Sequence, residues 1–138
     1  MTKVTAQLNN LRIAPRKVRL LADRVRGQHV VEAIGMLEYD LRGAAEPMQK
    51  LLKSAVANAQ NNFKLKSEDL YITDITVGEG PTLKRWTPRA YGRATKILKR
   101  TSRVSVVLSD SHSKVKKDNS QKDTGSSVKE SETDKKSK

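Results

Sequence analysis

The spacing of hydrophobic residues changes along the chain, and its alternating stretches predict three strands. Apolar and polar residues alternate at 4–8 and again at 104–108, which is typical of half-buried strands. Alternation also occurs over 70–77, but its phase shifts near Thr73 or Asp74, which indicates a β-bulge. The stretch at 104–108 is a clean partner strand for the one at 70–77.

Between the alternating stretches at 4–8 and 70–77, apolar residues recur at helical spacing. A helix is expected from Pro15 to a stop at Gly27, since proline suits the first helical position and glycine commonly follows the last turn. A second helix is expected over 30–39 and a third around 48–59, where Pro47 is tolerable only in the first turn. The first helix would bury one stripe and leave a mostly cationic outer surface. That stripe is expected to contain Val18, Leu21, Ala22 and Val25.

More than twenty residues separate the last two strands, which is longer than an ordinary hairpin loop. Glycine and proline at 78–81 mark one bend, and those at 88–92 mark another. Residues from about 79 to 103 are therefore expected to run out and back as a hairpin. With about ten residues in each arm at ~3.3 Å each, it would reach ~30 Å beyond the domain.

Composition limits the functions open to the chain. Hydrophobic residues make up 36 % and aromatic residues 4 % of the 138 residues, so the core is expected to be small. The absence of cysteine excludes a disulfide framework and a thiolate zinc site, and His29 and His112 are isolated from any serine or carboxylate motif. We therefore expect no enzyme, no metal centre and no cofactor. No stretch suits a membrane span or a signal peptide, so a soluble, unsecreted protein is expected.

The net charge of +13 is concentrated in two segments. Residues 12–26 carry six basic residues and one acidic residue, and residues 81–103 carry eight basic residues and no acidic one. Because a solvated surface normally mixes both signs, a polyanionic partner explains the second segment better than solvation alone. Frequent arginine, Trp86 and Tyr91 favour folded RNA with unpaired bases. A second role stays open for Trp86, as an apolar staple of the hairpin's own tip.

Residues 111–138 differ in composition from the rest of the chain. Val115 and Val128 are their only sizeable apolar residues, among seven serines and a mixture of charges. Such a segment cannot bury enough surface to offset its chain entropy, so a disordered low-complexity tail is expected after a domain at 1–110. A passive tail is favoured over one that adds loose contacts to a polyanion.

Three motifs resemble those of one known family. The run EGPTLKRWTPRAYGRATKILKRTS at 79–102 is similar to the tunnel hairpin of ribosomal protein twenty-two of the large subunit, in its bacterial and organellar form. APRKVRLLADRVRG at 14–27 resembles the first helix of that family, and KSAVANAQNN at 53–62 resembles its third. The likeness covers residues 3–110, and three motifs in this order and spacing are a specific match.

The resemblance implies an α+β fold, with three helices packed on a three-stranded antiparallel sheet and a long protruding β-hairpin. It implies a non-catalytic structural constituent of the large ribosomal subunit that binds ribosomal RNA. The hairpin would line the polypeptide exit tunnel, contact several RNA domains and support subunit assembly. The implied partners are large-subunit ribosomal RNA, neighbouring proteins including ribosomal protein four across the tunnel, and the passing nascent chain. The expected location is a ribosome in the cytoplasm, or in an organelle, with no membrane partner.

Carried over residue by residue, the resemblance also assigns a site. Thr101 and Ser102 would line the returning arm of the hairpin together with its lysines. The expected RNA contacts are Arg16, Lys17, Arg19, Lys84, Arg85, Arg89, Arg93, Lys96, Lys99, Arg100 and Arg103. The expected hairpin tip consists of Lys84, Arg85, Trp86, Thr87, Pro88, Arg89, Ala90, Tyr91, Gly92 and Arg93.

Two other functional classes stay open at this point. A DNA-compacting protein would also be small and basic, but its cations would be distributed to track a duplex. A membrane-surface or acidic-protein adaptor would need a helix with bulky apolar residues facing its partner, whereas the helix at 14–27 needs its stripe for the core.

Overall fold

A computed structural model describes residues 2–110, and the expected tail at 111–138 lies outside them. Within the described residues, three strands form an antiparallel sheet in the order β1–β5–β2. These strands are β1 (Lys3–Leu11), β2 (Tyr71–Glu79) and β5 (Ser102–Ser109). The predicted bulge is confirmed, because the register of β2 on β5 shifts between Ile72 and Asp74.

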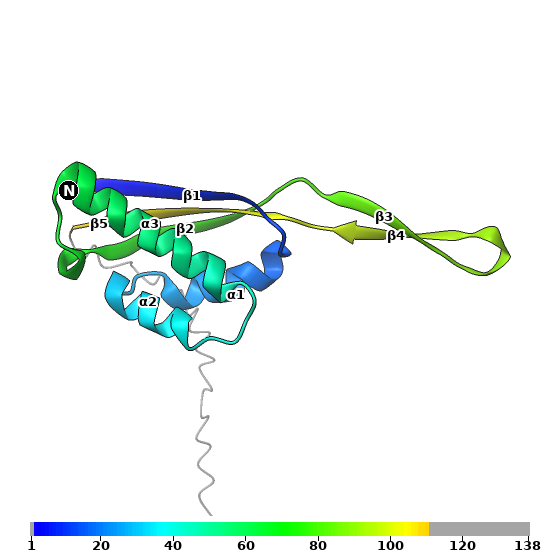
Figure 1. Cartoon of the computed structure of the whole chain (residues 1–138), viewed down its shortest axis with the longest axis horizontal. Coiled ribbons are helices and arrows are strands. Elements are labelled where there is room, and N and C mark those ends of the chain that lie inside the picture. The colour runs from blue at the N-terminus through cyan, green and yellow to red at the C-terminus, as the bar shows by residue number, and fades with distance from the viewer. Residues whose placement is uncertain (1, 111–138) are drawn as a thin grey trace, which may run out of the picture.

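Over the same part of the chain, three helices cover one face of this sheet (Figure 1). They are α1 (Pro15–Val25), α2 (Val30–Glu38) and α3 (Ala45–Phe63), and a short 3-10 turn at Ser67–Asp69 leads into β2. Helix α1 packs along β2, α3 packs along β1, and α2 packs on α3. The predicted α+β fold, with three helices on a three-stranded antiparallel sheet, is confirmed.

The helix boundaries follow from local residues. Pro15 is the first residue of α1, and Gly27, which follows its end, has a left-handed backbone with φ 76°. Pro47 is the third residue of α3, inside the first turn where no intrahelical hydrogen bond needs its missing N–H. Both prolines therefore lie where the sequence predicts them.

Two elements run further than their apolar patterns predict. Strand β1 continues past 4–8 through an irregularity at Asn10, where φ is 57°, and then pairs Leu11 with Ser102. Helix α3 continues to Phe63, and its apolar pattern does not report this end because the last residues are exposed and mostly polar.

The core between the helices and the sheet is built from the predicted apolar stripes. Small Ala55 and Ala59 are fully buried on α3 and let this helix approach the sheet closely. The buried stripe of α1 consists of Val18, Leu21, Ala22 and Val25, as predicted. The sheet contributes Ile72, Ile75, Val104, Val106 and Leu108 to the same core.

Two further strands, β3 (Leu83–Pro88) and β4 (Ala94–Lys99), form a separate antiparallel hairpin. We call residues 82–100 the arm. The arm follows β2 and leads into β5, and it projects from one end of the sheet beyond the helices (Figure 1). No residue from 83 to 100 is buried. The predicted long hairpin is therefore confirmed, and it adds nothing to the core.

Candidate nucleic-acid interface

The arm is attached to the domain by a buried, hydrogen-bonded base. Gly80 N–H donates to Thr101 O at 3.0 Å, and Thr101 Oγ1 donates to Pro81 O at 2.7 Å. Ser102 Oγ donates to Ile13 O in the loop before α1. Thr101 is 6 % exposed and Ser102 is fully buried. These contacts fix the direction in which the arm leaves the sheet.

Thr101 and Ser102 therefore correct one expectation, because they do not line the returning arm. Their side chains lie inside the base, where they satisfy carbonyl groups of Pro81 and Ile13. The physical reason is that strands part at this point, and buried carbonyls without a ladder partner need other donors. Small hydroxyl side chains provide these donors without enlarging the core.

The register of the arm places its cations beside apolar groups on both faces. Directly opposed side chains share one face, and successive pairs point to opposite faces. In the four pairs nearest the base, each cation therefore faces an apolar residue and not another cation. These pairs are Leu83–Lys99, Lys84–Leu98, Arg85–Ile97 and Trp86–Lys96. Neither face is apolar enough to pack against the domain.

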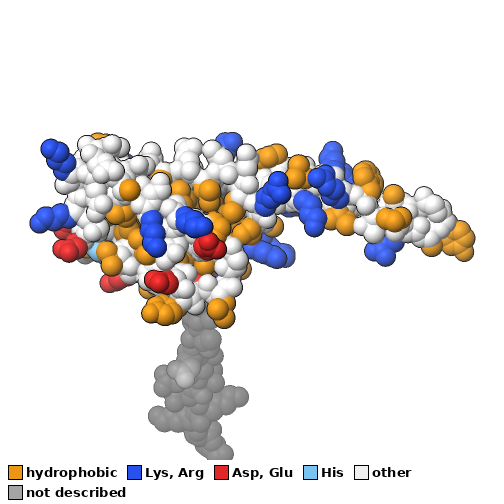
Figure 2. All heavy atoms as spheres, viewed as in Figure 1, with side chains coloured by type: hydrophobic (Ala, Val, Ile, Leu, Met, Phe, Trp, Pro, Cys, Tyr) orange, Lys and Arg blue, Asp and Glu red, His pale blue; other side chains and the backbone are white. Residues whose placement is uncertain are grey.

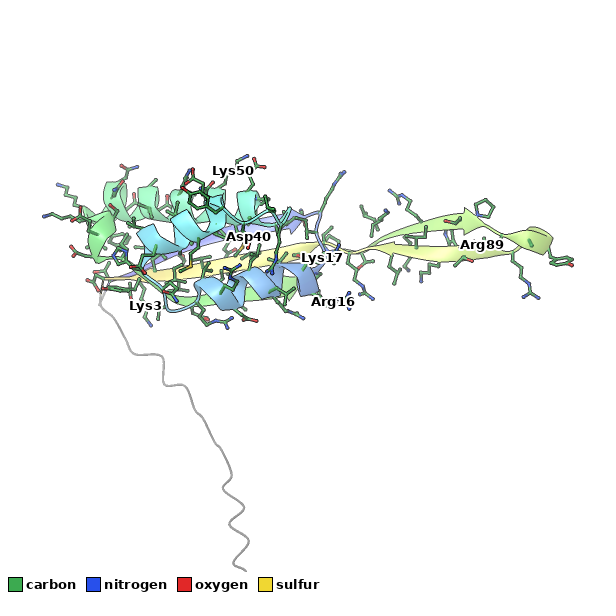
Figure 3. The ribbon with its side chains drawn as sticks, turned by 90° about the horizontal axis from the view of Figure 1, so that it is seen from below. Lys3, Arg16, Lys17, Asp40, Lys50 and Arg89 are labelled. Carbon is green, nitrogen blue, oxygen red and sulfur yellow. The ribbon has the colours of Figure 1, made fainter. Side chains whose placement is uncertain are left out.

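The tip of the arm is a tight turn with two left-handed residues. Arg93 N–H donates to Ala90 O at 3.3 Å, and Arg89 N–H donates to Arg93 O at 2.8 Å. Tyr91 and Gly92 have φ values of 57° and 67°, as the two central residues of a type I′ turn do. Tyr91 is fully exposed. The turn thus carries an exposed aromatic residue between Arg89 and Arg93, and Figure 3 marks Arg89 near this tip.

Ion pairs within residues 2–110 lie on the globular part and leave the arm unneutralised. The four pairs are Arg24–Asp40, Arg26–Asp23, Arg42–Asp40 and Lys50–Glu46. In the last pair, the hydrogen bond and the charge of Lys50 lower the pKa of the Glu46 carboxyl. No arm cation forms an ion pair with a described residue, and the arm itself contains no acidic residue.

Four basic residues in and just after α1 fall into two groups. Arg16 and Lys17 are exposed at the end of the domain next to the arm (Figure 3). Arg19 Nη2 instead donates to Val77 O at 3.3 Å, and Arg26 Nη2 donates to Ile75 O at 2.9 Å. Since β2 is an edge strand, these two arginines cover carbonyl groups that the sheet leaves open. Arg19, expected as an RNA contact, thus also holds α1 against the sheet.

The two basic segments meet at the base of the arm. A hollow of about 490 Å³ lies between the loop before α1 and the first residues of the arm. Its lining includes Arg12, Arg85, Lys99 and Arg100. Sequence reasoning missed Arg12 as a site residue, because its position right after a strand gives no local signal. Only the fold brings it beside the arm.

The surface view agrees with this distribution of charge. Figure 2 shows basic side chains along the arm and acidic side chains on the globular part only. Trp86 lies on the arm with 63 % of its surface exposed, opposite Lys96. Its ring has no aromatic partner among the described residues. The arm therefore presents cations, an indole ring and a phenol ring on a narrow projection.

Other kinds of site are not found in the described residues. They contain no cluster of three or more potential metal ligands, and none of their helices is long and apolar enough to span a membrane. His29 packs edge-on against Tyr71, with ring centroids 5.1 Å apart, and its Nε2 contacts Glu68 O. His112 lies outside the described residues.

The comparison with known families places this α+β domain with its projecting basic arm among the ribosomal proteins. The family model described as "Ribosomal protein L22p/L17e" matches residues 6–109, so the chain belongs to this family. The match covers the three helices, the whole arm and all of the sheet except the first three residues of β1.

The chain is also similar to individual proteins of this family, and three such relatives are each named large ribosomal subunit protein uL22. The protein of Pediococcus pentosaceus is 51 % identical over 110 residues, which cover 80 % of this chain and 93 % of the relative. The protein of Mesoplasma florum is 55 % identical over 106 residues, covering 76 % and 94 %. The protein of Ligilactobacillus salivarius is 51 % identical over 109 residues, covering 79 % and 95 %. The chain is thus a bacterial-type structural constituent of the large ribosomal subunit.

Proposed function

We propose that the chain binds large-subunit ribosomal RNA through its arm and the adjoining start of α1. The observation that carries this proposal is the set of eight cations at 81–103, which have no acidic partner among the described residues. Closely spaced phosphates neutralise such a set and release counterions on binding. The expected contacts are those named from the resemblance, with Arg12 added by the fold.

The arrangement of the arm favours folded RNA as the polyanion. Both faces carry cations and apolar groups, so RNA segments on both sides of the arm would be contacted at once. Trp86 and Tyr91 offer exposed rings on which unpaired bases stack. Phosphate contacts would supply most of the affinity, and the shape of the RNA would supply the specificity.

The same proposal includes the place of the arm in the subunit. The arm lines the polypeptide exit tunnel, opposite ribosomal protein four, and the nascent chain passes its tip. By contacting several RNA domains, the arm also supports subunit assembly. The bacterial relatives favour a ribosome in the bacterial cytoplasm over an organellar one.

Binding of the purified chain to large-subunit ribosomal RNA and to duplex DNA of equal phosphate content, over a range of salt, tests this proposal. The first variant carries K84Q, K96Q and K99Q on the arm. Its matched control carries K50Q, K53Q and K64Q on and just after α3, which removes the same charge elsewhere. The arm variant is expected to lower RNA affinity about 10- to 100-fold and to reduce the salt slope by about 2.

The control is expected to change RNA affinity by less than about threefold, since its lysines lie away from the arm. A further variant that lacks residues 82–98 should lose the preference for RNA over DNA. Equal binding to both polymers, with no effect of this deletion, would support the DNA-compacting alternative and refute the proposal.

A further inference from the structure

The hollow at the base of the arm is more specific than a general basic surface. It has a volume of about 490 Å³. Three parts of the chain surround it: the loop before α1, strand β3, and the end of β4 with the residues after it. Its lining includes Arg12, Ala14, Leu83, Arg85, Lys99 and Arg100. Two of them come from the segment that precedes α1, and four come from the arm.

Strand register explains why these side chains converge. Leu83 pairs with Lys99, so both point to the same face of the arm. Arg85 lies two residues further along β3 and shares that face. The bond from Ser102 Oγ to Ile13 O holds the loop before α1 against the base. Because the base is buried and hydrogen bonded, the hollow is preformed in the free chain.

The chemistry of the lining suits a group with an anionic part and a flat apolar part. Four cations, Arg12, Arg85, Lys99 and Arg100, line the hollow, and no acidic residue lines it. Leu83, Leu98 and Ala14 add apolar surface, and Leu83 is about two-fifths exposed in the free chain. Volumes of roughly 300–1,000 Å³ are typical of sites for small ligands, and a single nucleotide is of that size.

We infer that this hollow holds one unstacked nucleotide of the bound RNA. Its phosphates lie on the four cations, and its base packs against Leu83 and Ala14. This inference rests on the proposed RNA-binding function and deepens it, because it assigns a pocket to one extruded nucleotide. A base inside a duplex cannot enter the hollow, so bulged or looped RNA is the form recognised here.

Three RNA stem-loops test the inference with the full chain. One carries a single bulged uridine, the second carries an abasic residue at the same position, and the third is fully paired. The first two have equal phosphate content, so their difference reports the base alone. The chain is expected to bind the bulged RNA about five- to tenfold more tightly than the abasic RNA, because burial of the base is worth that much.

Two pairs of variants separate the pocket from the rest of the arm. Leu83→Ala is expected to bring the ratio of bulged to abasic affinity close to one. Ile97→Ala removes a similarly exposed apolar side chain that does not line the hollow, and it should keep the ratio. Arg12→Gln should weaken binding of both stem-loops more than Lys96→Gln, whose lysine points to the other face of the arm.

Equal binding of the bulged and abasic stem-loops by the unmodified chain overturns the inference, as does an unchanged ratio in Leu83→Ala. Tight binding of free uridine 5′-monophosphate would assign the hollow to a free nucleotide and would also overturn it. The proposed function is judged separately, by binding to large-subunit ribosomal RNA. If that binding is strong and depends on the arm lysines while the ratio is one, the function stands and only the pocket fails.

Discussion

The globular part and the arm handle positive charge in opposite ways. On the globular part, Arg24 and Arg42 share Asp40, and Arg19 and Arg26 donate to carbonyls of the edge strand β2. On the arm, each cation of the four pairs near the base lies opposite an apolar residue, and no acidic residue is present. Several arginines of the globular part therefore have partners within it, whereas no arm cation has an acidic partner among the described residues.

The same contrast holds for apolar groups. Twenty-two hydrophobic residues are buried in the globular part, while every residue from 83 to 100 remains at least partly exposed. An isolated two-stranded hairpin is marginal in water. The stability of the chain and its proposed binding of RNA should thus be separable by mutation.

The largest effect is expected from the core. Leu52 is fully buried on α3, and Leu52→Ala should lower the free energy of unfolding by about 2–5 kcal/mol, because it leaves a cavity. Leu98→Ala on the arm, where the side chain is 41 % exposed, should lower it by less than about 0.5 kcal/mol. Urea unfolding followed by circular dichroism measures both. Similar losses in the two variants would contradict the separation.

Charge reversal at the tip should affect binding and not stability. Arg89→Glu with Arg93→Glu is expected to lower the affinity for large-subunit ribosomal RNA about 10- to 100-fold, because phosphate contacts become repulsive. The matched control, Lys53→Glu with Lys66→Glu, places the same charge change on the globular part away from the arm. Filter binding measures affinity, and thermal unfolding measures stability. The model of an extended arm would be wrong if stability fell as much as binding.

A smaller effect is expected at the junction of the two regions. A Cβ on Gly80 would overlap Thr101 Oγ1, so Gly80→Ala should displace that side chain and break its hydrogen bond to Pro81 O. We expect a loss of about 1–2 kcal/mol in the free energy of unfolding. Gly43→Ala is the control, because no described atom lies within 4 Å of its added Cβ. An unchanged free energy of unfolding in Gly80→Ala would show that the contacts at the base do not hold the arm.

Local patterns were sufficient to predict most of the fold. Alternation gave the three strands and the bulge before Ile75, and Pro15 and Pro47 marked two helix starts. These features depend on residues close in sequence, or on which face of an element is apolar. The long hairpin was predicted from the length of the segment between two strands and from the glycine and proline residues that mark its bends.

The parts of the site that depend on tertiary contacts were not predicted. Arg12 joins the arm cations only because Ser102 binds the loop before α1. The bond from Arg19 to Val77 O spans 58 residues, so no local pattern reports it. Thr101 was assigned to the arm by its motif, yet it is buried, because it satisfies a carbonyl that local sequence does not show to be unpaired.

The smallest effect concerns the order of the arm tip in the free chain. Tyr91 has φ 57° at the first central position of a type I′ turn, where asparagine is favoured. A left-handed backbone costs an ordinary residue about 1–2 kcal/mol, so Tyr91→Asn should slow hydrogen exchange of the Arg93 amide, which donates to Ala90 O. Tyr91→Phe keeps the strain and should leave the exchange rate unchanged. The unfolding midpoint of the globular part should stay the same in both variants, because the tip has no contact with the core. A shift of that midpoint with the tip mutation would show that the arm and the globular part unfold as one cooperative unit, which would contradict their separation.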